Sequence, residues 1–383
     1  MSVTAPAGFR AAGLSAGLKA SGGRDLALVV NDGPRQAAAG VFTANRIKAA
    51  PVLWSEQVVR GGRLHAVLLN SGGANACTGP AGFRDTHATA ERAGQALGQS
   101  AAEVAVCSTG LIGERLPMES LLPGVDAAAG SLTRDGGTAA ADAIRTTDTV
   151  AKITFRRGDG YTVGGMAKGA GMLAPEMATM LCVLTTDADV GPDDLDSALR
   201  GASALTFDRV DTDGCMSTND TVLLLASGAS GTSPDGAEFA ALVRDVCADL
   251  CRQLVADAEG ASKEISVEVQ RAATGSDALE VGRAVARSNL VKCAIHGQDP
   301  NWGRILAAVG TTDADFAPDR VNIAVNGVWV CTGGVAAEDR TKVDLTARQA
   351  SITVDLAAGD AQTSVWTTDL TAAYVHENAA YSS

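Results

Sequence analysis

The segment from Lys168 to Leu181 constrains this chain more than any other stretch. It reads Lys-Gly-Ala-Gly-Met-Leu-Ala-Pro-Glu-Met-Ala-Thr-Met-Leu and runs directly into the apolar residues 182–184, which are typical of a buried strand. Glycines in its first half allow sharp turns, and Pro175 restricts the backbone four residues before Thr179. The pattern therefore predicts a loop that holds Thr179 at the N-terminal end of a core strand.

A threonine in such a place has two interpretations. Thr179 fits a structural role, because β-branched residues often open core strands. It also fits a catalytic role, if the Ala178–Thr179 peptide bond is cut so that the new α-amine lies beside the threonine hydroxyl. An α-amine has a pKa of about 7.7–8.0 and can act as a base near neutral pH. Cleavage would thus supply nucleophile and base in one residue.

The same glycines also fit a degenerate dinucleotide-binding fingerprint, Gly169-x-Gly171-x-x-Ala174. That fingerprint must open a helix, whereas Pro175 falls where the first helical turns should continue. The residues that follow are strand-like. We therefore do not favour a nucleotide site.

The segment 168–181 resembles, along its length, the fingerprint of the ornithine acetyltransferases, also called glutamate N-acetyltransferases. Members of this family cleave themselves before the threonine. The resemblance implies cleavage between Ala178 and Thr179, giving an α chain of residues 1–178 and a β chain of residues 179–383.

Acyl transfer requires hydrogen-bond donors directed at the oxygen that becomes negative in the tetrahedral intermediate. A predicted strand at 103–107 runs into Ser108-Thr109-Gly110, which by itself suggests only a turn. The family resemblance implies that Thr109 and Gly110 form the oxyanion hole, with the glycine N–H and the threonine hydroxyl as donors.

The resemblance also implies a set of substrate-binding residues. A lysine is a suitable point charge for an amino-acid carboxylate, and the carboxylate of Glu259 suits the δ-ammonium of ornithine, although it equally fits an exposed acid at a helix end. The chain terminus, which would normally fray, should be ordered against the substrate. The loop 71–80 and the polar run 211–221 should lie near the same site. The substrate-binding residues implied are Thr146, Lys168, Thr179, Glu259, Asn378 and Ser383.

The whole chain indicates a large, layered fold. At 383 residues it exceeds the usual size of one hydrophobic core. Helices alternate with strands, yet several strands are joined by tight hairpins, so the sheets should be mixed. We expect an α/β (mixed-sheet α+β) protein, a layered αββα-type sandwich with a smaller strand-rich C-terminal part and a sub-domain boundary near 273–276.

Hydrophobic periodicity locates the individual elements. The clearest hairpin joins Val321–Val325 to Val328–Cys331 through Asn326-Gly327, a type I′ turn signal. Strands are predicted at 37–43, 63–70, 103–107, 151–157, 161–167, 265–270, 291–296, 351–356 and 362–367, and helices at 84–97, 117–129, 137–145, 236–257 and 277–288.

Composition excludes several classes of function. The net charge of −13 argues against a nucleic-acid binder, which needs clustered basic residues. The sequence contains no stretch long and apolar enough for a membrane span and no leader pattern, so we expect a cytoplasmic protein. Its eight cysteines and four histidines show no metal-ligand spacing, which predicts free thiols and no metal site.

The reaction implied is a ping-pong acetyl transfer. Thr179 would take the acetyl group from N2-acetyl-L-ornithine and pass it to L-glutamate, in the cyclic pathway of arginine biosynthesis, with no cofactor. Acetyl-CoA as a second donor stays open, as does a paralogue serving a specialised metabolic cluster. The rivals are an N-terminal-threonine amidohydrolase or aminopeptidase, in which water replaces glutamate, and a processed binding or scaffold protein. Assembly as α2β2 or higher is implied by the resemblance alone.

Overall fold

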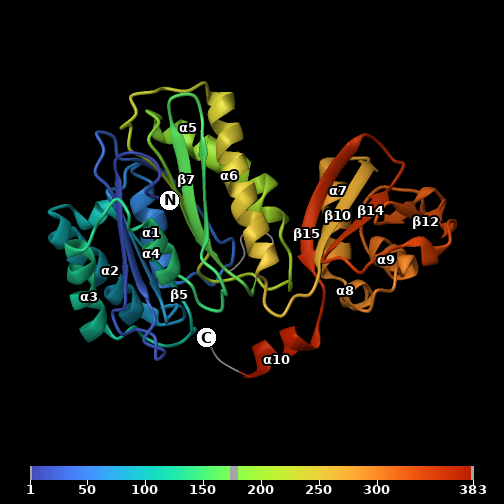
Figure 1. The fold of residues 1–383 in the computed structure, drawn as a ribbon, viewed down its shortest axis with the longest axis horizontal. Coiled ribbons are helices and arrows are strands. Elements are labelled where there is room, and N and C mark those ends of the chain that lie inside the picture. The colour runs from blue at the N-terminus through green and yellow to red at the C-terminus, as the bar shows by residue number, and fades with distance from the viewer. Residues whose placement is uncertain (1, 173–179, 381–383) are drawn as a thin grey trace. The chain divides into compact units, whose positions relative to one another are not determined.

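The computed structural model describes residues 2–172 and 180–380. These residues form two compact units. As far as its residues are described, the first unit comprises Met1–Asp208 and Cys215–Leu254, and the second comprises Arg209–Gly214 and Val255–Tyr381. Figure 1 shows the course of the chain.

The first unit contains two mixed sheets. The four-stranded sheet has the order β1-β2-β4-β5. Its β4–β5 pair is parallel, whereas the β1–β2 and β2–β4 pairs are antiparallel. In the five-stranded sheet, of order β3-β9-β8-β7-β6, only β8 and β9 are parallel. The bounds are β1 Phe9–Leu14, β2 Leu26–Asn31, β3 Ala37–Phe42, β4 Ala66–Ser71, β5 Val104–Thr109, β6 Lys152–Arg157, β7 Thr162–Lys168, β8 Leu181–Thr186 and β9 Thr221–Ala226.

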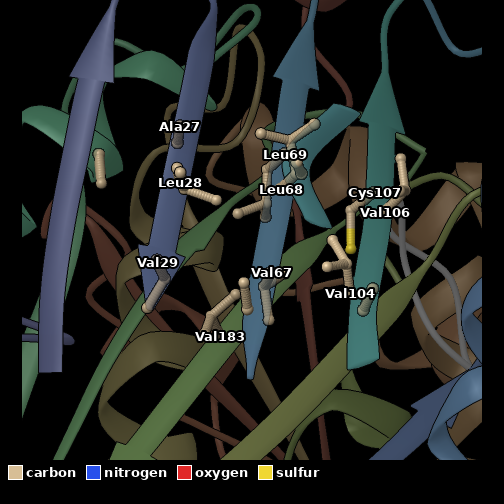
Figure 2. Close-up of a cluster of buried hydrophobic side chains, with 14 of the residues drawn as sticks. Ala27, Leu28, Val29, Val67, Leu68, Leu69, Val104, Val106, Cys107 and Val183 are labelled. Atoms are coloured by element: carbon tan, nitrogen blue, oxygen red, sulfur yellow. The ribbon is translucent and has the colours of Figure 1, made fainter. Parts of the chain in front are cut away.

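The two sheets face each other across one hydrophobic core. Val183 of the second sheet lies beside Val67 of the first (Figure 2), and these side chains belong to a single buried cluster. Because both faces of the strands are covered, the strands are apolar almost throughout rather than alternating.

Helices cover the outer faces, so the first unit has the layers of an αββα sandwich (Figure 1). On one side, α2 and α3 pack against each other and on the four-stranded sheet. On the other side α6 covers β7, where a side chain at Gly165 would meet Leu250 and Val246. The bounds are α1 Ala50–Val59, α2 Gly79–Leu97, α3 Met118–Gly130, α4 Gly137–Ala143, α5 Pro192–Leu205 and α6 Gly236–Ala256.

The second unit has its own six-stranded sheet, of order β13-β12-β11-β14-β10-β15, in which only β10 and β14 are parallel. The helices α7 and α9 pack on it over a separate buried core. The bounds are β10 Glu264–Ala272, β11 Asn322–Val325, β12 Val328–Thr332, β13 Val335–Ala336, β14 Gln349–Asp355, β15 Ala361–Thr368, α7 Gly275–Arg287, α8 Asn289–His296, α9 Trp302–Val309 and α10 Ala372–Ala380.

The predicted mixed α/β class is confirmed, and so is the Asn326-Gly327 hairpin, in which the two residues have φ angles of 46° and 81°. One element is wrong: the strand expected at 291–296 is helix α8. Its short apolar run does not distinguish strand from helix, and the deciding signal was Ser288, whose side chain accepts a hydrogen bond from Val291 N and caps the helix.

Within the described part of the chain, no helix is long and apolar enough to cross a membrane.

Candidate active site

The candidate site is built on the turn after β5. Gly110 has a φ of +130°, and a Cβ placed on it would lie 2.5 Å from Gly73 N. Gly73 N also donates a hydrogen bond to Thr109 O, at 3.0 Å. The turn therefore lies directly on the loop that follows β4, and only a glycine fits at position 110.

Buried amides hold this turn in place. Asn219 Nδ2 donates to Ser108 O at 2.8 Å and to Ala74 O at 2.7 Å, which links three segments far apart in the sequence. Ser108 Oγ in turn donates to Asn70 Oδ1 at 2.6 Å. Ala74 of the loop 71–80 and Asn219 of the polar run 211–221 both belong to this network, so these two residues lie against the Thr109 turn.

Lys168 reaches the same turn from the end of β7. Its Nζ donates to Thr109 Oγ1 at 3.2 Å, and each of the two residues is only 2% exposed. An ammonium that donates to a hydroxyl oxygen leaves the hydroxyl hydrogen to be directed elsewhere. Thr109 is thus a hydrogen-bond donor next to a buried positive charge.

A buried carboxylate, Asp148, joins this lysine to other expected site residues. Asp148 Oδ1 accepts from Lys152 Nζ at 2.6 Å and from Gly169 N at 2.7 Å, and Oδ2 accepts from Thr146 N at 3.0 Å. The side chains of Asp148 and Lys152 are completely withdrawn from solvent. One carboxylate therefore fixes the backbone of Thr146 and the residue after Lys168.

The charges explain why Asp148 is ionised. Burial by itself would raise the pKa of Asp148, but Lys168, Lys152 and the Gly169 amide outweigh burial and lower this pKa to about 2. The site thus contains two buried lysines that act on one buried carboxylate. Breaking a buried ion pair of this kind by removing one partner is costly.

A second buried carboxyl group, Asp220, lies directly before β9. Asp220 Oδ1 accepts from Met180 N at 3.0 Å, so it contacts the residue that follows Thr179. Complete burial raises the pKa of Asp220 well above its usual range. The expected nucleophile Thr179 and Ala178 lie outside the described residues.

Two of the other expected residues lie in the second unit and contact each other. Asn378 Nδ2, on α10, donates to Glu259 Oε2 at 3.0 Å. Glu259 follows α6 and is half-buried, while Asn378 is exposed. The expected ordered tail continues as helix to Ala380, and Ser383 lies outside the described residues.

The structure thus brings the expected residues together in two groups. Thr109, Gly110, Thr146 and Lys168 gather in the first unit, and Glu259 pairs with Asn378 in the second. Sequence reasoning placed the run 211–221 near the site but did not single out Asn219 or Asp220 within it, and it missed Asp148. Nothing local distinguished Asn219 and Asp220 from the rest of that run, or Asp148 from the other polar residues of 146–149.

Known proteins resemble this chain over its whole length. An arginine biosynthesis bifunctional protein ArgJ from Streptomyces coelicolor is 67% identical over 383 residues, covering 100% of both chains. The protein of the same name from Thermobifida fusca is 66% identical over 382 residues, again with 100% of both covered. A solved ornithine acetyltransferase complexed with ornithine, from Mycobacterium tuberculosis, is 62% identical, covers 47% of this chain and 96% of its own, and has a TM-score of 0.45.

The similarity to the two ArgJ proteins, which covers the whole of each chain, places this chain in one class with them. The model of the ArgJ family matches residues 10–383. The chain belongs to the ArgJ family.

Proposed function

We propose that this enzyme transfers the acetyl group of N2-acetyl-L-ornithine to L-glutamate through an acetyl ester of Thr179. Its role lies in arginine biosynthesis, as the names of its relatives indicate for those proteins. The observation that carries the proposal is the buried contact between Lys168 Nζ and Thr109 Oγ1, because it places a polarised donor beside Gly110.

The first step is self-cleavage, in which one water molecule hydrolyses the Ala178–Thr179 bond and divides the chain into residues 1–178, with a new carboxylate, and residues 179–383, with a new α-amine. The new α-amine of Thr179 then accepts the proton of the Thr179 hydroxyl as its oxygen attacks the acetyl carbonyl. The oxyanion accepts hydrogen bonds from the Thr109 hydroxyl and the Gly110 N–H. The C–N bond breaks, the α-nitrogen of ornithine takes the proton, and the acetyl group stays on Thr179 as an ester.

The second half-reaction reverses these events with a new acceptor. The amine of glutamate attacks the ester carbonyl and gives a proton to the α-amine of Thr179, while the same two donors stabilise the oxyanion. The C–O bond to Thr179 then breaks, and that proton passes to the Thr179 oxygen. The reaction needs no group beyond the two substrates and the protein. Because the acetyl group waits on the enzyme, the kinetics should be ping-pong.

Charge complementarity supports the assignment of the substrate contacts. The buried ammonium of Lys168 suits a substrate carboxylate, and Thr146 has its backbone fixed by the Asp148 side chain. Glu259 suits the side-chain ammonium of ornithine, with Asn378 hydrogen-bonded beside it. We assign Ser383 to the same substrate.

Thr179→Ala and Thr179→Ser test the proposal. The alanine variant should remain one uncleaved chain, whereas the serine variant should cleave slowly and retain some transfer. Wild-type protein incubated with N-acetylornithine should give a peptide beginning at Thr179 with one added acetyl group, by mass spectrometry. An uncleaved wild-type chain that still transfers acetyl groups would overturn the scheme, and release of acetate with no acetylglutamate would replace it by hydrolysis.

A second donor is favoured by the word bifunctional in the names of the relatives, which applies to those proteins. We infer that acetyl-CoA also acetylates glutamate here. Release of free CoA in the presence of glutamate but without N-acetylornithine is the measurement. Absence of CoA release at saturating glutamate would restrict the enzyme to one donor.

We further propose that the cleaved αβ unit assembles as α2β2 or a higher oligomer. Light scattering of the cleaved protein gives its mass directly, and a mass equal to one αβ unit would contradict this assembly.

A further inference from the structure

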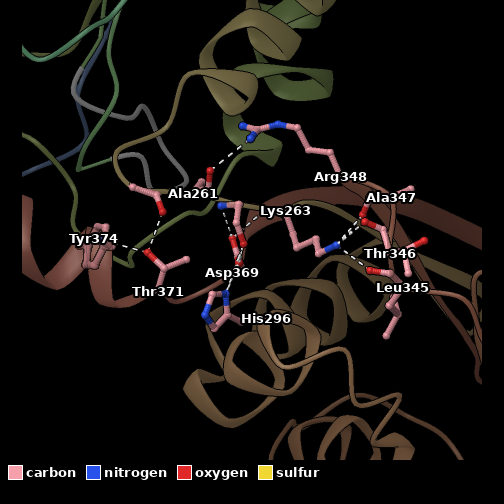
Figure 3. Close-up of polar contacts among 12 residues, drawn as sticks. Ala261, Lys263, His296, Leu345, Thr346, Ala347, Arg348, Asp369, Thr371 and Tyr374 are labelled. Carbon is pink, nitrogen blue, oxygen red and sulfur yellow. Dashed lines mark hydrogen bonds and ion pairs between the residues drawn. The ribbon is translucent and has the colours of Figure 1, made fainter.

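The turn that contains Glu259 is held at one end by the carboxylate of Asp369, directly after β15. Asp369 Oδ1 accepts from Ser262 N at 2.9 Å and from Lys263 N at 2.8 Å. Its Oδ2 contacts the Ser262 hydroxyl and accepts from His296 Nδ1 at 2.8 Å (Figure 3). The side chain is fully buried, so this set of donors defines where the turn lies.

The donors around Asp369 keep it ionised. Burial opposes ionisation, but hydrogen bonds from the Ser262 hydroxyl, the Lys263 amide and His296 lower the pKa of Asp369 below its usual range. Lys263 is itself anchored, since its Nζ donates to Leu345 O at 2.6 Å and Ala347 O at 2.6 Å (Figure 3). The turn is thereby joined to the sheet of the second unit.

The contacts of Asp369 do not make a hydrolytic triad. A triad needs serine and aspartate on opposite nitrogens of the histidine ring. Here Ser262 Oγ lies 3.2 Å from His296 Nδ1, and Asp369 contacts that same nitrogen. The Ser262 hydroxyl also contacts the carboxylate directly, so the arrangement holds the turn and activates no nucleophile.

The other end of the turn is joined to α10 by Thr371. Thr371 Oγ1 accepts from Tyr374 N at 2.9 Å, which caps the helix, and donates to Gly260 O at 2.6 Å (Figure 3). Gly260 has a φ of +61°, and a Cβ placed on it would lie 2.2 Å from Tyr374 N. The first turn of α10 therefore packs on the backbone next to Glu259.

These contacts determine how Glu259 and Asn378 meet. Helix α10 has 9 residues, and a helix of that length is marginal in water without tertiary contacts. Asn378 Nδ2 donates to Glu259 Oε2 and to Tyr374 O, both at 3.0 Å. With its amide nitrogen so engaged, Asn378 presents its carbonyl oxygen, which suits a substrate ammonium together with the Glu259 carboxylate.

We propose that Asp369 and Thr371 are positioning residues that hold the Glu259 turn against α10, so that Glu259 and Asn378 form one binding edge for the side-chain ammonium of the amino-acid substrate. This inference rests on the substrate contacts proposed above. It deepens them, because the geometry of the pair that binds the ammonium, Glu259 and Asn378, is set by two residues that do not touch the substrate.

Thr371→Val tests the proposal on the full chain, since valine keeps the shape of threonine and removes both hydrogen bonds. Calorimetry should show the Kd for ornithine rising about tenfold, while Thr371→Ser, which retains the hydroxyl, stays near wild type. Norvaline, which lacks the δ-ammonium, should bind wild type and Thr371→Val equally. Asp369→Asn should weaken ornithine binding in the same direction. Lys342→Gln, which removes only an exposed ion pair with Glu338, is the control and should leave the Kd unchanged.

A second readout separates this inference from the proposed function. Acetylation of Thr179 by p-nitrophenyl acetate needs no ammonium contact, so its rate in Thr371→Val should equal that of wild type. Selective loss of ornithine affinity supports positioning. The inference is overturned if Thr371→Val binds ornithine as tightly as wild type. It is also overturned if this variant loses ornithine affinity and the rate of acetylation by p-nitrophenyl acetate to the same extent. If wild type is never acetylated but Thr371→Val still weakens ornithine binding, the acyl-threonine mechanism fails and the positioning role stands.

Discussion

The ammonium of Lys168 lies 3.2 Å from the hydroxyl oxygen of Thr109, and both residues are 2% exposed. An interaction of this kind is stronger away from water than at a surface, because the local dielectric is low. The contact therefore orients the Thr109 hydroxyl and increases its strength as a donor. This contact is the basis of the first prediction.

Thr109→Val should lower the rate of Thr179 acetylation by about 10²–10³-fold, the usual effect of removing one oxyanion-hole donor. The valine fills the same space, so the fold should be retained. Thr109→Ser keeps the hydroxyl and should retain most of the rate. The measurement is the single-turnover rate with N-acetylornithine, and equal rates in Thr109→Val and Thr109→Ser would contradict a donor role.

Gly110→Ala should reduce activity about 100-fold for a backbone reason. The new Cβ would lie 2.5 Å from Gly73 N, so the turn must move, and a displacement of about 1 Å can reduce a rate about 100-fold. Gly113→Ala is the matched control, because Gly113 also has a positive φ of +92° but nothing lies within 4 Å of its Cβ position. The control should show only the strain of about 1–2 kcal/mol. Comparable activity in the two variants would contradict the prediction.

Asp148→Asn should destabilise the protein by about 3–5 kcal/mol, because it removes the negative charge from a fully buried ion pair with Lys152. Urea denaturation gives the change in the free energy of unfolding. Asp142→Asn is the matched control, since Asp142 forms an ion pair with Arg145 at 2.8 Å while 35% exposed and should contribute at most about 1 kcal/mol. Equal effects of the two substitutions would show that the buried charge at Asp148 is unimportant.

The stabilisation by Asp148 should depend on pH in a defined direction. The pKa of this carboxyl falls from 3.8 to about 2 on folding, so its stabilisation is complete above 3.8 and is lost as the pH falls through about 2. This shift corresponds to about 2 kcal/mol. The difference in unfolding free energy between wild type and Asp148→Asn should therefore shrink by that amount from neutral pH to about pH 2. A difference that does not change with pH would contradict the assignment.

Asp220 should show the opposite dependence. Burial raises its pKa well above the unfolded value of 3.8, so folding takes up a proton above that pH, and stability falls as the pH rises toward the folded pKa. Asp220→Asn resembles the neutral acid in shape and does not titrate. The melting temperature of Asp220→Asn relative to wild type should therefore rise between pH 5 and pH 8. A relative melting temperature that falls over this range would mean that Asp220 is ionised in the folded protein.

Local patterns predicted most of the strands correctly, and the errors have physical causes. The hairpin of β6 and β7 was signalled by two apolar runs around Gly158-Asp159-Gly160, and it pairs as expected. Helix α1 gave no clear amphipathic pattern, because Trp54 and Ser55 both face inward and donate hydrogen bonds to carbonyls of β5. Its position depends on the edge of the sheet that it covers, which no local pattern reports.

The amino-acid sequence by itself determined the class of fold, the family and the candidate chemistry of Thr179, Thr109 and Gly110, since those signals lie in short contiguous motifs. Only the tertiary structure decided that Asp148 would link Thr146 to Gly169, and that Asp369 would hold the turn of Glu259 from more than a hundred residues away. Such contacts join single polar residues across long separations. A lone buried carboxylate has no periodicity and no motif, and its partners are set by how strands and helices pack.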